Sequence, residues 1–183
     1  MHPVGQPSVD GLADLVRRTQ VPVWLPWPLP RGWVVTGTTW AGDDRSGPRA
    51  TAVALSGPAP LGGMGEMLLV AEEPGTGLGA RFAGLAGPDP GPVPDRAPDA
   101  KVHAAGHPTA LWAVGSDPGR VGFVGEALGC WLYVVLWPER AQALLLEDLG
   151  LADARDLGHE IDLVPTGALT PRLAGAPAEA PPG

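Results

Sequence analysis

The chain has 183 residues, of which 44% are hydrophobic and 17% charged, which suits one domain with a buried core and excludes disorder throughout. Its formal net charge is −8, so the sequence offers no basic surface for nucleic acid or for an anionic membrane. The single cysteine excludes an internal disulfide and a cysteine zinc cluster.

The N-terminal residues and the longest apolar run indicate where in the cell the protein is located. The first residues lack the basic and apolar regions of a signal peptide, and the run at 130–137 is too short to span a bilayer as a helix. We therefore expect a soluble, cytoplasmic protein. The predicted divisions are a flexible N-terminus (1–7), a single domain (8–173) with a Pro/Gly-rich loop (87–99), and a disordered tail (174–183).

The first elements are a helix and a proline-rich segment. Ser8 is positioned to cap a helix over 9–19, with Leu12, Leu15 and Val16 on one side. Four prolines follow within "VPVWLPWPLPRGW" (21–33), and because proline fixes φ and lacks an N–H, we expect this segment to be extended.

Short strands with turn residues between them come next. They are predicted at 32–40, 50–56, 66–72, 101–106, 109–115, 120–126 and 130–137, the last two joined as a hairpin. The segment 130–137, "CWLYVVLW", is apolar at both parities, which is typical of an interior strand covered on both faces. Simple alternation places Trp131, Tyr133 and Trp137 on one face, and Trp33 and Trp40 on opposite faces.

The C-terminal third is predicted to contain a helix from Pro138 to Gly150, a helical turn at 151–158 and a strand at 160–164. Strands do not alternate with helices along the chain. The predicted class is therefore α+β, with a mostly antiparallel sheet of short strands and a helix near each end.

A glycine-rich stretch, "EEPGTGLGARFAG" (72–84), contains the spacing G-x-G-x-x-A and raises the question of a phosphate site. A dinucleotide fingerprint needs a crossover helix and a second strand after the glycines, whereas here a short glycine-rich segment leads into the proline-rich 87–99. Glu72 and Glu73 also put negative charge where a pyrophosphate would bind. We interpret this stretch as a turn, and "GPAPLGGMGE" (57–66) likewise.

The remaining candidates for chemistry are few. Asp43, Asp44 and Arg45 lie in a stretch whose composition is typical of a turn. His103 and His107 have i,i+4 spacing, but Gly106 and Pro108 exclude a helix there, so no metal site and no cofactor is predicted.

Cys130 opens the most apolar strand and is interpreted as a small buried hydrophobic residue. The tryptophans indicate core, an interface or the floor of a ligand pocket.

Several segments together resemble an uncharacterised actinobacterial protein family, some members of which carry a phosphotransacetylase label. They include 21–33, "LLVAEEPGTGLGARFAG" (68–84) and "PTGALTPRL" (165–173), and the resemblance covers Pro7 to Leu173. It implies no catalytic residues. Relatives often begin with a zinc-ribbon-like C-x-x-C segment, so we expect either a naturally shortened member or a start placed too late. The segment "LPRGWVV" and the late elements are also similar to sensor-like α+β domains of some anti-sigma-type proteins.

These observations favour a non-catalytic domain that binds a protein partner or a small ligand. Trp24 and Trp27 are the first candidates for contact, since tryptophan is enriched at interface hot spots, with Arg45 and Arg81 as further contacts. The alternative is an enzyme for a phosphorylated or acyl substrate. It would hold the anion at glycine turns 62–65 and 75–79, use Asp43, Asp44 or Glu73 as acid or base, and use Arg45 or Arg81 as counter-charge.

Overall fold

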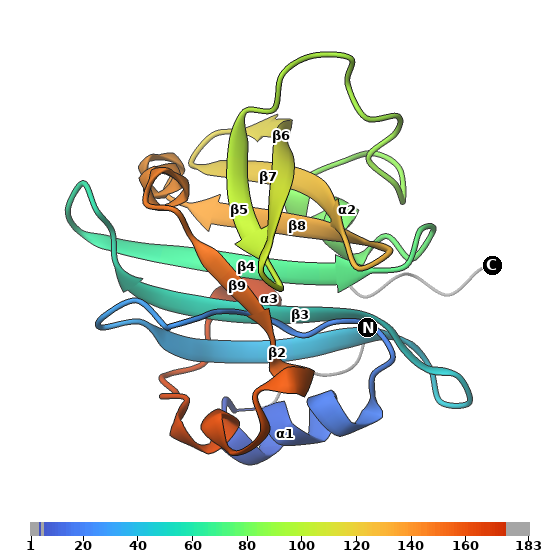
Figure 1. Cartoon of the computed structure of the whole chain (residues 1–183), viewed down its shortest axis with the longest axis vertical. Coiled ribbons are helices and arrows are strands. Elements are labelled where there is room, and N and C mark those ends of the chain that lie inside the picture. Colours follow the sequence, from blue (N-terminus) through green and yellow to red (C-terminus); the bar gives the residue numbers. More distant parts are fainter. Residues whose placement is uncertain (1–3, 5, 175–183) are drawn as a thin grey trace.

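The computed structural model describes residue 4 and residues 6–174, and it shows a sheet of nine strands that curls into a half-barrel (Figure 1). The strand order is β1-β9-β5-β6-β7-β8-β4-β3-β2. The strands are β1 (Trp24–Pro26), β2 (Val34–Asp43), β3 (Gly47–Pro58), β4 (Met64–Glu72), β5 (Ala100–Ala104), β6 (His107–Asp117), β7 (Arg120–Ala127), β8 (Cys130–Trp137) and β9 (Gly150–Asp153).

Helical elements are few and short. The α-helices are α1 (Val9–Arg18), α2 (Leu78–Ala83) and α3 (Pro171–Ala174), and the 3-10 helices are η1 (Glu139–Leu146), η2 (Ala154–Asp156) and η3 (Gly158–Leu163). The predicted α+β class with a helix near each end is therefore wrong: the fold is mostly sheet. The error arose because the C-terminal third, expected to be largely helical, forms 3-10 turns around one more strand.

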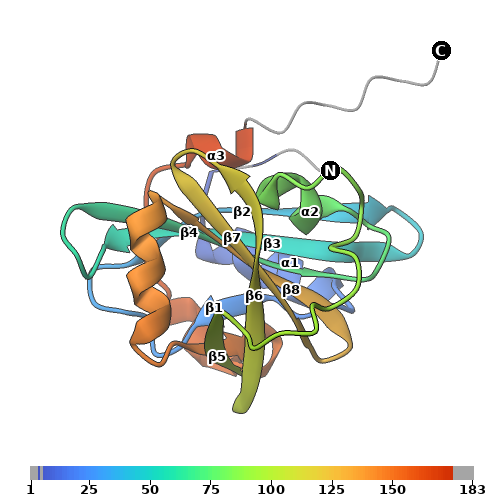
Figure 2. The same ribbon diagram turned by 90° about the horizontal axis from the view of Figure 1, so that it is seen from above.

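Two antiparallel meanders, β2-β3-β4 and β5-β6-β7-β8, meet where β4 pairs with β8. The short β9 runs parallel to β5 and antiparallel to β1, and it crosses in front of β4 and β3 in Figure 1. The sheet thus has an inner face, which packs against α1, β1 and the 3-10 turns, and an outer face, which carries α2 and α3 (Figure 2). Each face has its own buried apolar cluster.

The interior strand β8 is confirmed. It pairs antiparallel with β4 on one side and β7 on the other, and seven of its eight residues are buried. Leu132, Val134 and Leu136 belong to the inner cluster. Trp131, Tyr133 and Trp137 share the outer face, as alternation predicted. Burial on both faces explains why this stretch is apolar at both parities.

The prediction for Trp33 and Trp40 is wrong, because β2 is not regular. A register shift between Val35 and Gly37 adds a residue to β2 relative to β3, which reverses the alternation. Both indoles therefore pack against the inner cluster. Simple counting along a strand fails wherever a bulge intervenes.

Local signals predicted α1 well but not the C-terminal third. Ser8 Oγ accepts a hydrogen bond from the Gly11 N–H at 3.0 Å, and Leu12 and Leu15 are buried. The predicted strand at 160–164 is instead η3. Ile161 of η3 is buried, and so are Leu157 before it and Val164 after it. These positions are spaced as in a helical turn and not as in a strand.

The chain after η3 closes part of the outer face. Leu173 is fully buried there, and the Arg172 guanidinium lies over the Trp137 ring, 5.1 Å from its centroid. Arg172 Nε also donates to Glu66 Oε2 at 2.6 Å. This end of the outer face is therefore covered, and the opposite end, near Trp131, is where a site can form. The termini predicted to be flexible or disordered lie largely outside the described residues.

Candidate functional site

The glycine-rich stretch 72–84 forms the end of β4, a loop and the six-residue α2. Gly75 and Gly77 have positive φ, as a turn requires. An anion site would need free backbone N–H groups here. Two of them are already occupied by carboxylates of the chain itself: Gly79 N–H donates to Glu72 Oε2 at 2.9 Å, and Gly75 N–H donates to Asp89 Oδ1 at 2.8 Å. The geometry therefore gives no support to phosphate binding.

Glu72 has the most perturbed environment of the carboxyl groups in the described part of the chain. Its side chain is fully buried beneath α2, and burial raises its pKa from 4.5 to about 7, against the lowering effect of the α2 amides. Its Oε1 and the Tyr133 hydroxyl are both buried without a hydrogen-bond partner among the described residues. Burial, with Glu72 nearby, raises the pKa of Tyr133. The pair lies within the core, and we interpret Glu72 as a structural cap of α2.

Gly79 sets how closely α2 approaches the sheet. A Cβ at this position would lie 2.2 Å from Cδ2 of the Tyr133 ring. We expect Gly79→Ala to lower the free energy of unfolding by about 2 kcal/mol, because overpacking a buried contact outweighs the better helix propensity of alanine. Urea denaturation measures this. Gly87→Ala is the control, since its nearest atom would be 3.9 Å away, and it should leave stability unchanged. Equal stability of the two variants would contradict the close contact.

The acidic and basic candidates lie on separate turns. At the β2–β3 hairpin the Ser46 hydroxyl donates to Asp43 Oδ2, and the N–H groups of Ser46 and Arg45 donate to Asp43 Oδ1. These bonds, the hydroxyl first, hold the pKa of Asp43 below its usual value. Glu73 is paired with Arg49 at 2.8 Å. Asp44, Arg45 and Arg81 have exposed side chains.

The two glycine turns of the enzymatic alternative lie far apart. The 62–65 turn joins β3 to β4, whereas 75–79 follows the other end of β4. They are thus separated by the length of the strand, and the structure does not bring them together (Figure 1).

Trp24 and Trp27 are less available than the sequence suggested. Trp24 lies in β1, pairs with Asp153 of β9, and has 1% of its surface exposed. Trp27 is partly buried and packs against the inner cluster. β1 is thus a core strand, and the proline-rich 21–33 segment presents Trp24 to the interior.

His103 and His107 lie on the paired strands β5 and β6, and His103 Nδ1 is 3.0 Å from Asp148 Oδ1. No group of three or more metal-ligating side chains occurs within the described residues. Cys130 is buried, and burial raises the pKa of its thiol, which opposes a role as nucleophile.

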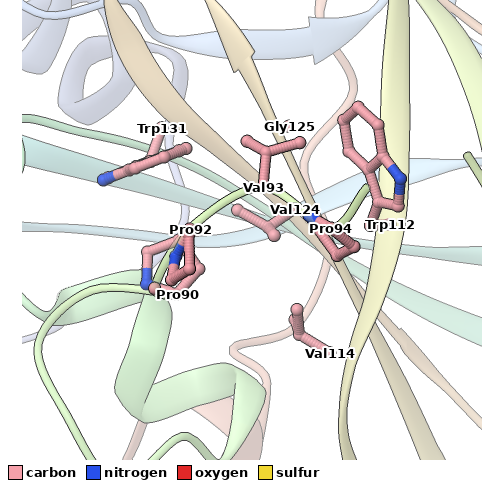
Figure 3. Close-up of a pocket in the computed structure, with 10 residues that line it drawn as sticks. Pro90, Pro92, Val93, Pro94, Trp112, Val114, Val124, Gly125 and Trp131 are labelled. Carbon is pink, nitrogen blue, oxygen red and sulfur yellow. The ribbon is translucent and has the colours of Figure 1, made fainter. Parts of the chain in front are cut away.

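A pocket that the sequence did not reveal lies on the outer face (Figure 3). It is lined by residues 90–94 of the proline-rich loop, by Trp112 and Val114 of β6, by Val124 and Gly125 of β7 and by Trp131 of β8. Pro90 and Pro92 lie near the Trp131 indole, and Pro94 lies near Trp112. The lining is almost entirely apolar, with an indole ring at either end, and the cavity it encloses is small, about 40 Å³. We call it the tryptophan pocket.

The loop over this pocket is held at both ends, and we call residues 89–96 the strap. Asp89 Oδ1 accepts from Trp131 Nε1 at 3.2 Å, and the Arg96 carbonyl accepts from Trp112 Nε1 at 3.1 Å. Just beyond the strap, Asp99 Oδ2 accepts from the Ala113 N–H at 2.8 Å. The Pro/Gly-rich loop thus runs across the outer face with hydrogen-bonded contacts at both ends of the strap.

Comparison with known protein families gave a match. The model of a family of unknown function (DUF6758) matches residues 1–173. The chain belongs to this family. Neither the curated proteins nor the solved structures gave a match. No helix among the described residues is both long and apolar enough to cross a membrane.

In this family member, the sequence did carry a signal for the tryptophan pocket. Prolines recur at every second position from Pro88 to Pro94. Trp112 is a large aromatic residue in the predicted strand at 109–115. What the sequence lacked was any indication that the prolines and the tryptophans, far apart along the chain, lie together.

Proposed function

We propose that the protein is a non-catalytic binding domain whose ligand site is the tryptophan pocket. The single observation that carries the proposal is an apolar pocket between Trp112 and Trp131 on an outer face whose other end is closed by α3. Indole rings give a large contact area with little loss of side-chain freedom, which favours binding of an apolar group. The ligand is either a small molecule or a side chain of a protein partner.

The enzymatic alternative has weaker support. An anion would have to displace Glu72 from the Gly79 N–H or Asp89 from the Gly75 N–H, and the second glycine turn lies at the other end of β4. Glu73 is engaged by Arg49, and Asp43 by its own hairpin. We also propose a cytoplasmic location and an actinobacterial origin, as the composition and the resemblance to the actinobacterial family led us to expect.

Fluorine NMR of protein labelled with 5-fluorotryptophan tests the proposal. We expect apolar aromatic fragments such as indole and naphthalene derivatives to shift the Trp112 and Trp131 signals saturably, with a Kd on the order of 1 mM. The buried Trp24 and Trp33 signals should not move. Assignment uses Trp112→Phe and Trp131→Phe.

Two variants control this titration. Trp112→Ala should weaken fragment binding at least tenfold. Leu146→Ala should leave it unchanged, although Leu146 is 87% exposed and belongs to a separate apolar surface. The proposal is overturned if no fragment shifts Trp112 or Trp131 at millimolar concentration, or if Leu146→Ala removes binding and Trp112→Ala does not.

A further inference from the structure

We propose that the tryptophan pocket takes a proline-rich segment of a partner protein, and that the strap is a resident segment of the same chemistry which the partner replaces. This inference rests on the proposed function, because it names the ligand of the same site. It is argued from the strap, which forms one wall of the pocket.

The strap contacts the pocket chiefly through proline rings. The lining is apolar between the two indoles, which favours contact with flat apolar rings. Proline has no N–H and presents a flat apolar ring. Pro90, Pro92 and Pro94 all line the pocket, and this is the same pairing of proline with aromatic side chains by which proline-rich ligands are recognised generally.

The two indole N–H groups define the ends of the recognised segment. Each donates to an oxygen of the strap, one to the Asp89 carboxylate and one to the Arg96 carbonyl. A replacing segment must therefore supply an acceptor on either side of its prolines. An aspartate and a main-chain carbonyl in the same positions would satisfy both donors.

The centre of the strap is held by packing alone. Within the described chain, residues 90–95 make no hydrogen bond, and the anchors are Asp89 and Arg96 at the ends. Val93, at the middle, is 52% exposed. The loop that contains the strap runs from the end of α2 to the start of β5, a length that is uncommon without a function in a compact domain. Such a segment can leave the pocket while the sheet stays folded.

The test supplies the strap sequence in trans. The probe is a capped synthetic peptide of residues 87–97, GPDPGPVPDRA. The protein is the full chain with Pro90→Ser, Pro92→Ser and Pro94→Ser. These substitutions weaken the contact of the strap with the pocket and keep both anchors, Asp89 and Arg96. We expect the peptide to shift the Trp112 and Trp131 fluorine signals of this variant with a Kd on the order of 100 µM. The wild-type chain should bind it at least tenfold more weakly, because its own strap competes at high effective concentration.

Three comparisons make the result decisive. A peptide with all four prolines replaced by serine should not bind. The single variant Pro92→Ser, at an exposed position, should bind the peptide with an affinity between those of wild type and the triple variant. It replaces the triple variant in the experiment if the triple variant does not fold. If neither variant binds the peptide while aromatic fragments still shift Trp112 and Trp131, the inference on proline-rich partners is overturned and the proposed function stands. If the fragments fail too, both are overturned.

Discussion

Asp153→Ala is expected to lower the free energy of unfolding by about 3 kcal/mol. The Asp153 side chain is 2% exposed at the end of β9. It accepts hydrogen bonds from the Val23 N–H, from the Arg155 N–H and from the Arg155 guanidinium, with distances from 2.6 to 3.2 Å. Its removal leaves a buried N–H and a half-buried cation without their partner, which is where the largest losses from single substitutions arise.

The Asp153–Arg155 cluster joins β9, η2 and the segment between α1 and β1. Arg155 Nη1 donates to the Gln20 carbonyl at 2.7 Å, so the cluster connects β9 with the segment between α1 and β1. Urea denaturation followed by tryptophan fluorescence measures the effect. Asp156→Ala, at the exposed position three residues on, is the matched control and should change stability by less than about 0.5 kcal/mol. A loss below about 1 kcal/mol in Asp153→Ala would contradict a structural role for this cluster.

Glu72→Gln is expected to stabilise the protein at pH 8 by up to about 3 kcal/mol. Burial raises the Glu72 pKa from 4.5 to about 7, so the folded protein holds this proton more tightly than the unfolded chain does. The stability that the proton contributes is fully present below pH 4.5, declines between pH 4.5 and 7, and is lost above pH 7. At about 1.4 kcal/mol per pH unit, that interval corresponds to about 3 kcal/mol. Glutamine keeps an acceptor for the Gly79 N–H and carries no charge to bury.

The measurement is the free energy of unfolding at pH 5 and at pH 8. Wild type should lose stability over this interval, and Glu72→Gln should lose much less. Glu73→Gln is the control, because Glu73 is 44% exposed and paired with Arg49, and it should keep the wild-type dependence on pH. Identical pH dependence of Glu72→Gln and wild type would show that Glu72 is not the buried titrating group.

The site was harder to predict from the sequence than the strands that carry it. Trp24 was expected to be a contact residue because tryptophan is enriched at interface hot spots, but pairing of β1 with β9 buries it. Glu73 was considered as an acid or base and Glu72 was not, although Glu72 is the carboxyl with the raised pKa. Adjacent residues of a strand point to opposite faces of the sheet, and tertiary packing decides which of the two faces α2 covers.

The sequence by itself determined the elements whose signals are local. The Ser8 cap and apolar spacing define α1, and the uninterrupted apolar run defines β8 as an interior strand. Only the tertiary structure decided the rest. A bulge in β2 turned Trp40 to the inner face, pairing with β1 and β5 made 150–153 a strand, and the strap came to lie across Trp112 and Trp131. The reason is physical: these outcomes depend on contacts between residues far apart in the chain, and the free energy of such contacts overrides local propensity.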